Sequence, residues 1–262
     1  MKLDKIQVLR KLLIPLFSKV NLGDIRISHH YTGDKILIHS FKHKGYWYHG
    51  KNREYETMVA FKKILKPGDT VIEIGGHIGY ISLWFSYLVG PKGSVHVFEP
   101  GENNLPYIRY NISNKTNITL IEKGAGSKNE TLIFYLDNLT GQNNSFLGEH
   151  DAFKETKKNA YIKNTELQKV EVDVIRVDDY VMQKNIKPRL IKIDVEGYEC
   201  EVLKGLIETL KIYKPILMVE IAQDNRDWVY KTMDKLGYVG YTPTLKKETR
   251  DQIGNVFFMH SR

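Results

Sequence analysis

The stretch that decides the fold is Val71-Ile72-Glu73-Ile74-Gly75-Gly76-His77-Ile78-Gly79-Tyr80. Its first four residues are mostly β-branched and apolar, as in a buried strand, and its glycines permit the sharp turn with which a helix begins. Comparable apolar runs recur at 94–99, 117–121, 190–193 and 215–221. Helical patterns lie near 79–90, 103–114, 199–210 and 226–236. This alternation predicts an α/β fold with a doubly wound, mostly parallel sheet that is covered on both faces.

Other regions alternate polar and apolar residues, as hairpin strands do. They lie at 25–48, at 131–136 with 170–175, and at 238–241 with 255–260. The last pair predicts a C-terminal antiparallel strand pair. A polar segment, 137–169, is long enough to form a lid over a bound acceptor. We expect two parts, an N-terminal helix with a small β extension over residues 1–50 and the main domain over residues 51–262.

Composition narrows the class of protein. The 262 residues are 42% hydrophobic, enough for one large core. The single cysteine, Cys200, excludes internal disulfides, so we expect a reducing, cytoplasmic setting. An apolar run at 12–17 is too short to span a bilayer. Residues 1–20 form an amphipathic basic stripe, which suits either a helix packed on the domain or peripheral contact with an anionic membrane.

The glycine turn carries the first chemical signal. It reads Glu73-x-Gly75-x-x-x-Gly79 instead of the dinucleotide fingerprint G-x-G-x-x-G. A carboxylate at this point repels a pyrophosphate but suits a cationic amino group, such as that of S-adenosylmethionine. Glu99 ends the next strand twenty positions after Gly79, where an acceptor for ribose hydroxyls belongs. The alternative is that both acids are solvated strand ends.

Further motifs extend this signal along the chain. They are Lys66-Pro67-Gly68-Asp69, Phe98-Glu99-Pro100 and Leu190-Ile191-Lys192-Ile193-Asp194-Val195-Glu196-Gly197-Tyr198-Glu199. Together with Tyr55-Glu56 and the glycine turn, these motifs follow one another along the chain. Their order resembles that of the motifs in the FkbM-type methyltransferases, and the resemblance covers roughly residues 50–225. The resemblance implies a class I methyltransferase fold, S-adenosylmethionine as methyl donor and O-methylation of hydroxyls, frequently on sugars. In the family the turn usually reads Gly-Ala-Asn-x-Gly, so His77 stands where an asparagine is usual.

The residues that we expect to bind the donor follow from the turn, the strand ends and the resemblance. They are Glu56, Glu73, Gly75, Gly76, His77, Gly79, Tyr80, Glu99, Pro100, Gly124, Ala125, Ser145 and Asp194.

Three carboxylates are candidates for catalysis. Asp194 and Glu196 follow one buried strand, and Glu220 ends the next. A hydroxyl acceptor needs a group that takes its proton, and two close carboxylates raise one pKa toward that of a base. We expect Asp194 to be the general base or the acceptor-orienting group, with Glu196 second. Alternatively, Glu196 caps the following helix, or the three carboxylates bind Mg²⁺.

The sequence leaves the acceptor and some alternatives open. A sugar or glycan is expected, and the net charge of +8 allows a nucleotide- or phosphate-linked form. An RNA 2′-O-methyltransferase is the main alternative, since Lys51, Lys192 and Lys214 could support such chemistry. No RNA-reading module is visible, so we do not expect a nucleic acid partner. A non-catalytic interaction protein on the same fold is a further alternative, and the oligomeric state stays open.

Overall fold

The computed structural model describes residues 22–138, 140–148, 167–248, 250 and 252–261. The predicted N-terminal helix, with its hypothesis of membrane contact, and most of the predicted lid lie outside these residues.

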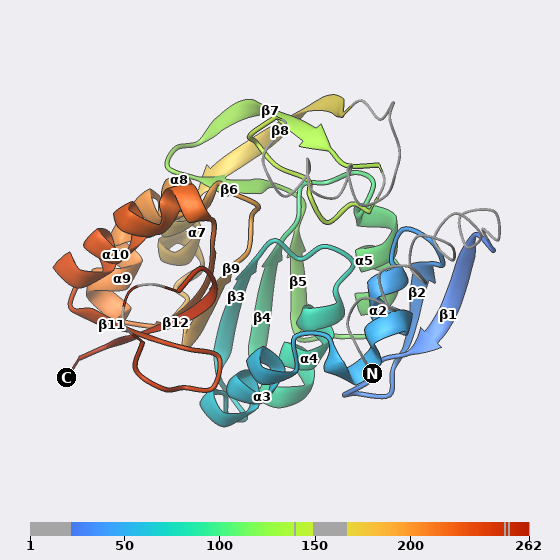
Figure 1. Ribbon diagram of the computed structural model, residues 1–262, viewed down its shortest axis with the longest axis horizontal. Helices are drawn as coiled ribbons and strands as arrows, with labels where there is room; N and C mark the ends of the chain where they lie inside the picture. The colour runs from blue at the N-terminus through green and yellow to red at the C-terminus, as the bar shows by residue number, and fades with distance from the viewer. Residues whose placement is uncertain (1–21, 139, 149–166, 249, 251, 262) are drawn as a thin grey trace, which may run out of the picture.

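A seven-stranded sheet forms the centre of the described structure (Figure 1). Its strands are β3 (Thr70–Ile74), β4 (Ser94–Phe98), β5 (Ile118–Ile121), β9 (Leu190–Ile193), β10 (Ile216–Ile221), β11 (Tyr238–Tyr241) and β12 (Gly254–His260). They lie in the order β11-β12-β10-β9-β3-β4-β5. Strands β3, β4, β5, β9 and β10 run parallel, whereas β12 is antiparallel to both β10 and β11. The predicted parallel sheet and C-terminal antiparallel pair are therefore confirmed.

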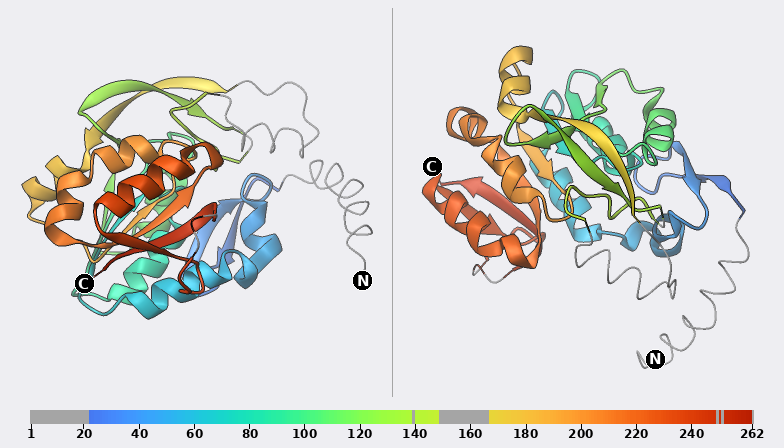
Figure 2. Two further views of the ribbon diagram at one scale, coloured as in Figure 1. Left: turned by 60° about the vertical axis from the view of Figure 1, so that its left-hand side comes forward. Right: turned by 90° about the horizontal axis from the view of Figure 1, so that it is seen from above.

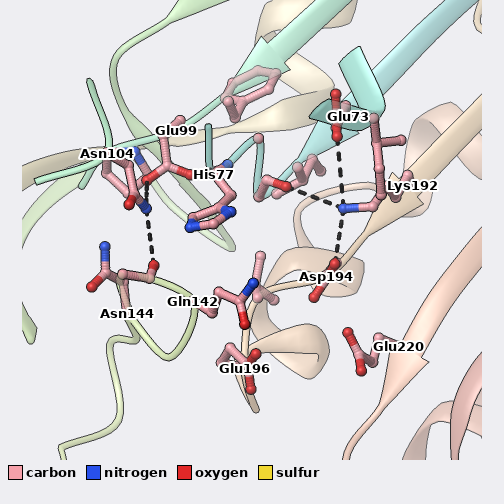
Figure 3. A pocket seen from close by; sticks show the side chains of 18 of the residues that line it. Glu73, His77, Glu99, Asn104, Gln142, Asn144, Lys192, Asp194, Glu196 and Glu220 are labelled. Atoms are coloured by element: carbon pink, nitrogen blue, oxygen red, sulfur yellow. Dashed lines mark hydrogen bonds and ion pairs between the residues drawn. The ribbon is translucent and has the colours of Figure 1, made fainter. Parts of the chain in front are cut away.

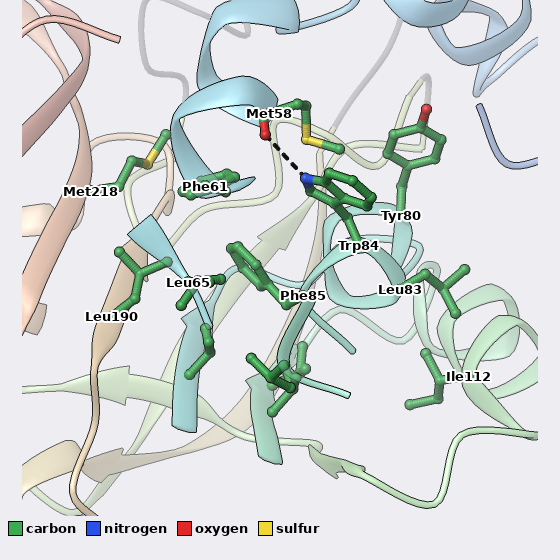
Figure 4. Close-up of a cluster of buried hydrophobic side chains, with 14 of the residues drawn as sticks. Met58, Phe61, Leu65, Tyr80, Leu83, Trp84, Phe85, Ile112, Leu190 and Met218 are labelled. Carbon is green, nitrogen blue, oxygen red and sulfur yellow. Dashed lines mark hydrogen bonds between the residues drawn. The ribbon is translucent and has the colours of Figure 1, made fainter. Parts of the chain in front are cut away.

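Helices cover both faces of this sheet. One face carries α3 (Tyr55–Ile64), α4 (Tyr80–Val89) and α5 (Leu105–Ile112). The other carries α7 (Val177–Lys184), α8 (Glu199–Lys204), α9 (Ile207–Tyr213) and α10 (Arg226–Lys235). Successive strand residues point to opposite faces, so Val71 packs in the first core cluster and Ile72 in the second. Figure 4 shows the first cluster, where the Trp84 indole donates a hydrogen bond to the Met58 carbonyl at 3.1 Å.

The helices differ from the prediction in two respects. The helix expected over 199–210 is split into α8 and α9 around Gly205, where a Cβ would lie 2.0 Å from the Gly126 carbonyl oxygen. The close approach of the two backbones requires a glycine at this point. In addition, the helices α3 and α7 were not among those predicted.

Smaller elements surround the sheet. They are β1 (Asp24–Ser28), β2 (Lys35–His39), α2 (Lys44–His49), β6 (Gly124–Gly126), β7 (Glu130–Leu136), β8 (Gln168–Arg176) and the 3-10 turns Gly50–Asn52 and Gln223–Asn225. β6, β8 and β7 form a three-stranded sheet that lies across one end of the central sheet (Figures 1 and 2). β1 and β2 form the predicted N-terminal hairpin.

The hairpin is joined to the main domain by polar and apolar contacts. The Asn111 side chain on α5 accepts a hydrogen bond from Leu37 N at 2.6 Å and donates one to Leu37 O at 3.1 Å. Ile36 and Ile38 on β2 belong to the first core cluster. The domain boundary at residue 50 stays a prediction, but the core is continuous across it.

Candidate functional site

The candidate site is a cavity of about 240 Å³ at the carboxyl ends of β3, β4, β9 and β10. The chain leaves β3 toward β4 on one side, whereas β9 lies on its other side. Such a reversal of strand order opens a crevice at the carboxyl ends of the strands, where ligands of α/β sheets bind. The segments around 46–54 and 141–146 close the cavity from the sides.

The glycine turn brings two strand ends together. Gly75 has a φ of 88°, and a Cβ at this position would lie 1.9 Å from the Asp194 carbonyl oxygen. Only glycine therefore allows β3 and β9 to end in contact. Gly79 begins α4 and is not among the residues that line the cavity; a Cβ there would meet Ile108 at 3.0 Å. Gly79 has a φ of 81° and packs against α5, and its predicted contact with the ligand has no support in the cavity lining.

Glu99 is held at the floor of the cavity by backbone and side-chain donors. It accepts hydrogen bonds from His77 N at 2.7 Å, from Gly101 N at 2.9 Å and from the Asn104 side chain at 3.2 Å. Only 4% of its surface is exposed. Burial raises its pKa to about 7 in spite of these donors. The side-chain oxygen of Asn104 is itself buried, and no donor among the described residues bonds to it.

Lys192 joins the ends of β3 and β9. Its Nζ lies 3.0 Å from Asp194, 3.7 Å from Glu73 and 3.1 Å from the Gly75 carbonyl oxygen (Figure 3). Glu73 also accepts a hydrogen bond from Ser82 at 2.6 Å. Burial raises the pKa of Glu73 to about 7, with Lys192 acting against this rise. Glu73 thus already has a cationic neighbour in Lys192, whereas the sequence alone indicated only the amino group of a ligand as its partner.

The three candidate catalytic carboxylates all face the cavity (Figure 3). Burial favours a higher pKa for Asp194, but Lys192 and a hydrogen bond with Glu220 lower it to about 2. Repulsion by Asp194 and burial raise the pKa of Glu220 well above its usual range. Burial and the nearby Asp194 raise the pKa of Glu196 to about 8. A raised pKa was expected within this group, but it falls on Glu196 and Glu220, and Asp194 is the weakest base.

His77 fits the turn in place of the usual asparagine. Its φ is 48°, in the left-handed region that asparagine and histidine enter more readily than most residues. The ring nitrogens lie 3.0 Å from the Tyr46 hydroxyl and 3.4 Å from the Thr140 carbonyl oxygen. Burial lowers the pKa of His77 to about 3, so the ring is neutral at physiological pH. His77 thus bonds to flanking segments with its side chain and to Glu99 with its backbone.

Most of the predicted donor-binding residues line the cavity. Those that do are Glu73, Gly75, Gly76, His77, Tyr80, Glu99, Pro100, Gly124, Ala125 and Asp194. Two other predictions need correction. Glu56 is exposed in the first turn of α3, and Glu54, two residues earlier, lines the cavity instead. Ser145 donates to the Glu196 carbonyl oxygen at 2.9 Å, so it fixes the backbone and lies outside the lining.

Several lining residues were missed at the sequence level. They are Tyr46, Arg53, Glu54, Asn104, Gln142, Asn144 and Phe146. Asn144 and Phe146 belong to the described end of the predicted lid, where Phe146 packs against Phe134 and Tyr198 at 4.7 Å between ring centroids. Gln142-Asn143-Asn144-Ser145 gave only a weak signal, because such a run is also an ordinary polar turn.

Two further expectations concern metals and membranes. Within the described ranges, no group of three His, Cys, Asp or Glu side chains could hold a metal ion. The Mg²⁺ hypothesis therefore has no geometric support, and Lys192 already places a cation beside Asp194. No helix within the described part of the chain is long and apolar enough to cross a membrane.

Comparison with known proteins identifies the family. The model of the Methyltransferase FkbM domain matches residues 73–241. A curated relative, 31-O-demethyl-FK506 methyltransferase FkbM of Streptomyces tacrolimicus, is 27% identical over 164 residues, covering 54% of this chain and 61% of its own length. Methyltransferase 1 of Beauveria bassiana is 27% identical over 149 residues, covering 53% of this chain and 59% of its own length. The chain thus spans about three fifths of these curated relatives.

Solved structures include methyltransferase FkbM of Methylobacillus flagellatus KT. It is 17% identical, covers 78% of this chain and 53% of its own, and has a TM-score of 0.48. The strand order and the family match together give the class I methyltransferase fold that the resemblance implied. Because the match extends over well more than half of the sequence, this chain belongs to the Methyltransferase FkbM domain family.

Proposed function

We propose that the protein is an S-adenosylmethionine-dependent O-methyltransferase that acts on a hydroxyl of a sugar or glycan. The observation that carries the proposal is the arrangement of carboxylates around one cavity. Buried Glu73 and Glu99 lie at the ends of β3 and β4, and Glu196 and Glu220 lie beyond Asp194 at the ends of β9 and β10 (Figure 3). The first pair suits the donor and the second pair suits an acceptor hydroxyl.

The charges of the cavity fit S-adenosylmethionine. Among the charged residues that line the cavity, carboxylates outnumber cations: Glu54, Glu73, Glu99, Asp194, Glu196 and Glu220 lie with Arg53 and Lys192. Lys123 also lines the cavity but pairs with Asp173 at 3.1 Å. Burial raises the pKa values of Glu73 and Glu99, and a ligand with a sulfonium and an ammonium group would favour their ionised forms. When bound, S-adenosylmethionine supplies an electrophilic methyl group.

Hydrogen-bonding capacity points to the same ligand. One oxygen of Glu99 accepts from Gly101 and Asn104, while the other accepts from His77 alone among the contacts found. A carboxylate oxygen has two lone pairs, so Glu99 can accept a further hydrogen bond from a ribose hydroxyl. The buried oxygen of Asn104 needs a donor, which the ligand could provide. Glu99 and Asn104 would therefore hold the ribose end of the donor.

Glu196 is the residue best suited to take the acceptor proton. Its pKa of about 8 lies close to physiological pH, which is where a general base is most effective. Asp194 stays ionised beside Lys192 and can accept a hydrogen bond from the acceptor hydroxyl without removing its proton. Asp194 thus orients the acceptor, and Glu196 accepts the proton.

The choice of acceptor rests on family and charge. The name of the curated Streptomyces relative describes methylation of an oxygen. The resemblance to FkbM-type enzymes implies a sugar or a sugar-bearing compound as the acceptor. Carboxylates outnumber cations among the charged residues that line the cavity, which disfavours binding of RNA phosphates and hence a 2′-O-methyltransferase.

The test combines binding with turnover. Calorimetric titration with S-adenosylhomocysteine should give a one-to-one complex, and transfer from a labelled donor should appear with a sugar in an acceptor panel. Glu196→Gln should lower kcat by about 10²-fold or more while the affinity for S-adenosylhomocysteine changes less than about twofold. Glu201→Gln, on the outer side of α8, is the matched control. Absence of transfer to every hydroxyl would refute the proposal.

A further inference from the structure

Arg53 lines the cavity, but the proposed function assigns it no part in binding the donor or the acceptor. Arg53 lies between α2 and α3, twenty positions before the family match begins at residue 73. It nevertheless lines the cavity with Asp194 and Glu220. A quarter of its side chain, 25%, is exposed. Arg53 is thus a partly exposed cation that lines the cavity together with Asp194 and Glu220.

An aromatic ring supports the guanidinium of Arg53. Its Cζ lies 4.6 Å from the centroid of the Tyr46 ring, a geometry in which a cation is attracted to the ring face. Tyr46 is buried, and its hydroxyl is hydrogen-bonded to His77 at 3.0 Å. The glycine turn therefore fixes the ring through its hydroxyl, and the ring fixes Arg53 through its face. Tyr46 links the donor side of the cavity to the acceptor side.

Gly45 leaves the space that this arrangement needs. A Cβ at Gly45 would lie 2.8 Å from a terminal nitrogen of Arg53, closer than such atoms approach. Gly45 lies within α2, where alanine is the better helix former, and its φ is not in the left-handed region. Neither helix formation nor backbone conformation therefore calls for glycine. The space is taken by the guanidinium of Arg53.

The guanidinium keeps donors for a ligand. It has five N–H groups, and Glu54 is its ion-pair partner at 3.6 Å. We propose that Arg53 is an acceptor-binding residue, and that Tyr46 and Gly45 exist in this chain to position it. This inference rests on the proposed function.

As the acceptor O–H bond breaks, the proton passes to Glu196 and the oxygen's electron pair forms the bond to the methyl carbon. The bond from that carbon to sulfur breaks, and the donor leaves as a neutral thioether.

In this step, Arg53 donates hydrogen bonds to the acceptor oxygens and stabilises the charge that develops on the reacting one. Donors placed in this way typically contribute about 10²-fold or more to kcat.

The experiment displaces Arg53 without removing it. Gly45→Ala should lower kcat/KM for the best sugar by about 10-fold, since the added Cβ would push the end of the Arg53 side chain from its place on the Tyr46 ring. Its affinity for S-adenosylhomocysteine and its melting temperature should stay unchanged. The matched control is Gly148→Ala, where a Cβ would meet the Tyr135 ring at an ordinary 3.5 Å. Wild-type turnover in Gly45→Ala would overturn the inference.

Two further variants separate the roles of Arg53 and Tyr46. Arg53→Ala should lose turnover, and methylguanidinium in the buffer should restore part of it, which a purely structural role would not allow. Tyr46→Phe keeps the ring but removes the hydroxyl that meets His77, so it should weaken binding of S-adenosylhomocysteine more than it slows transfer. Absence of rescue together with an unchanged KM in Arg53→Ala would contradict acceptor binding.

A binding readout distinguishes failure of this inference from failure of the proposed function. In ¹⁵N-labelled protein saturated with S-adenosylhomocysteine, the Nε–H signal of Arg53, assigned with Arg53→Lys, should shift when the panel sugars are titrated. If the protein transfers methyl groups but this signal does not respond, the inference is wrong and the proposed function stands. If no transfer occurs with any hydroxyl, the proposed function fails, and the response of the signal still decides whether Arg53 binds sugars.

Discussion

Lys192 is the residue whose removal should affect the fold most. It is 1% exposed and lies beside two carboxylates, Glu73 and Asp194. Lys192→Met would leave both charges without a cation, which costs about 3–5 kcal/mol of unfolding free energy for a buried pair. Urea unfolding would measure this loss, and Lys192→Met with Glu73→Gln should recover part of it. Lys204→Met, at an exposed ion pair on α8, is the control and should cost under about 0.5 kcal/mol.

Glu99 is the residue that most directly tests donor binding. Glu99→Ala removes the acceptor for a ribose hydroxyl and leaves the His77 and Gly101 N–H groups without their partner. We expect the affinity for S-adenosylhomocysteine to fall by about 10- to 100-fold, as for loss of hydrogen bonds to a charged group. Calorimetry would measure it. Parent-like binding by Glu99→Ala would rule out the ribose assignment while leaving the rest of the site intact.

The site residues were predictable to different degrees. Glu73, Glu99, Asp194 and Glu220 end strands whose apolar pattern was clear, so their common location followed from sheet topology. The protonation pattern did not follow, because it depends on Lys192, whose position opposite Glu73 is set by strand register. Arg53 could not be found at all from sequence, since it reaches the cavity from an irregular segment.

At the scale of elements, the start of α9 depends on a buried side chain from α7. Asp178 accepts hydrogen bonds from Glu208 N at 3.1 Å and Thr209 N at 2.8 Å, and it is fully buried. Asp178→Ala would leave these helix-terminal donors without a partner, which should cost about 2–3 kcal/mol. Asp179→Ala, at an exposed neighbour, should cost less than about 0.5 kcal/mol. Equal midpoints in urea for the two variants would contradict this role.

The elements show why the sequence predicted strands better than helices. Strands β3, β9 and β10 lie within a residue of their predicted bounds, because each is a short apolar run buried on both faces. The break between α8 and α9 lies where Gly205 contacts β6. Gly205 and β6 are far apart in the sequence, so helical periodicity does not reveal this contact. The position of this helix break is thus associated with a long-range contact and not with the local sequence pattern.

At the scale of the whole molecule, buried acids and histidines set the response to pH. The pKa values of Glu73 and Glu99 are raised to about 7 and that of Glu196 to about 8, so the folded state holds protons that the unfolded state has lost. Because of these three acids, the free energy of unfolding should fall as the pH rises from about 4.5 to 8. His29 and His77 have pKa values lowered to about 4 and 3, so they act in the opposite direction, but only below pH 6.5.

The net expectation is a fall in melting temperature of the ligand-free protein between pH 6.5 and 8.5, where the histidines no longer offset the acids. Thermal unfolding at constant ionic strength would measure it. Glu196→Gln should flatten the upper part of the curve. A melting temperature that rises across this interval would show that the acids are already ionised in the folded state.

The place of β12 in the sheet has a consequence for how the protein is made. β12 lies between β10 and β11, yet it is the last of the seven strands to be translated. Until it emerges from the ribosome, the nascent chain carries β10 as an open edge, which is able to pair with other chains. Shielding by a chaperone late in synthesis would protect that edge, and a premature stop shortly before residue 254 should yield insoluble product.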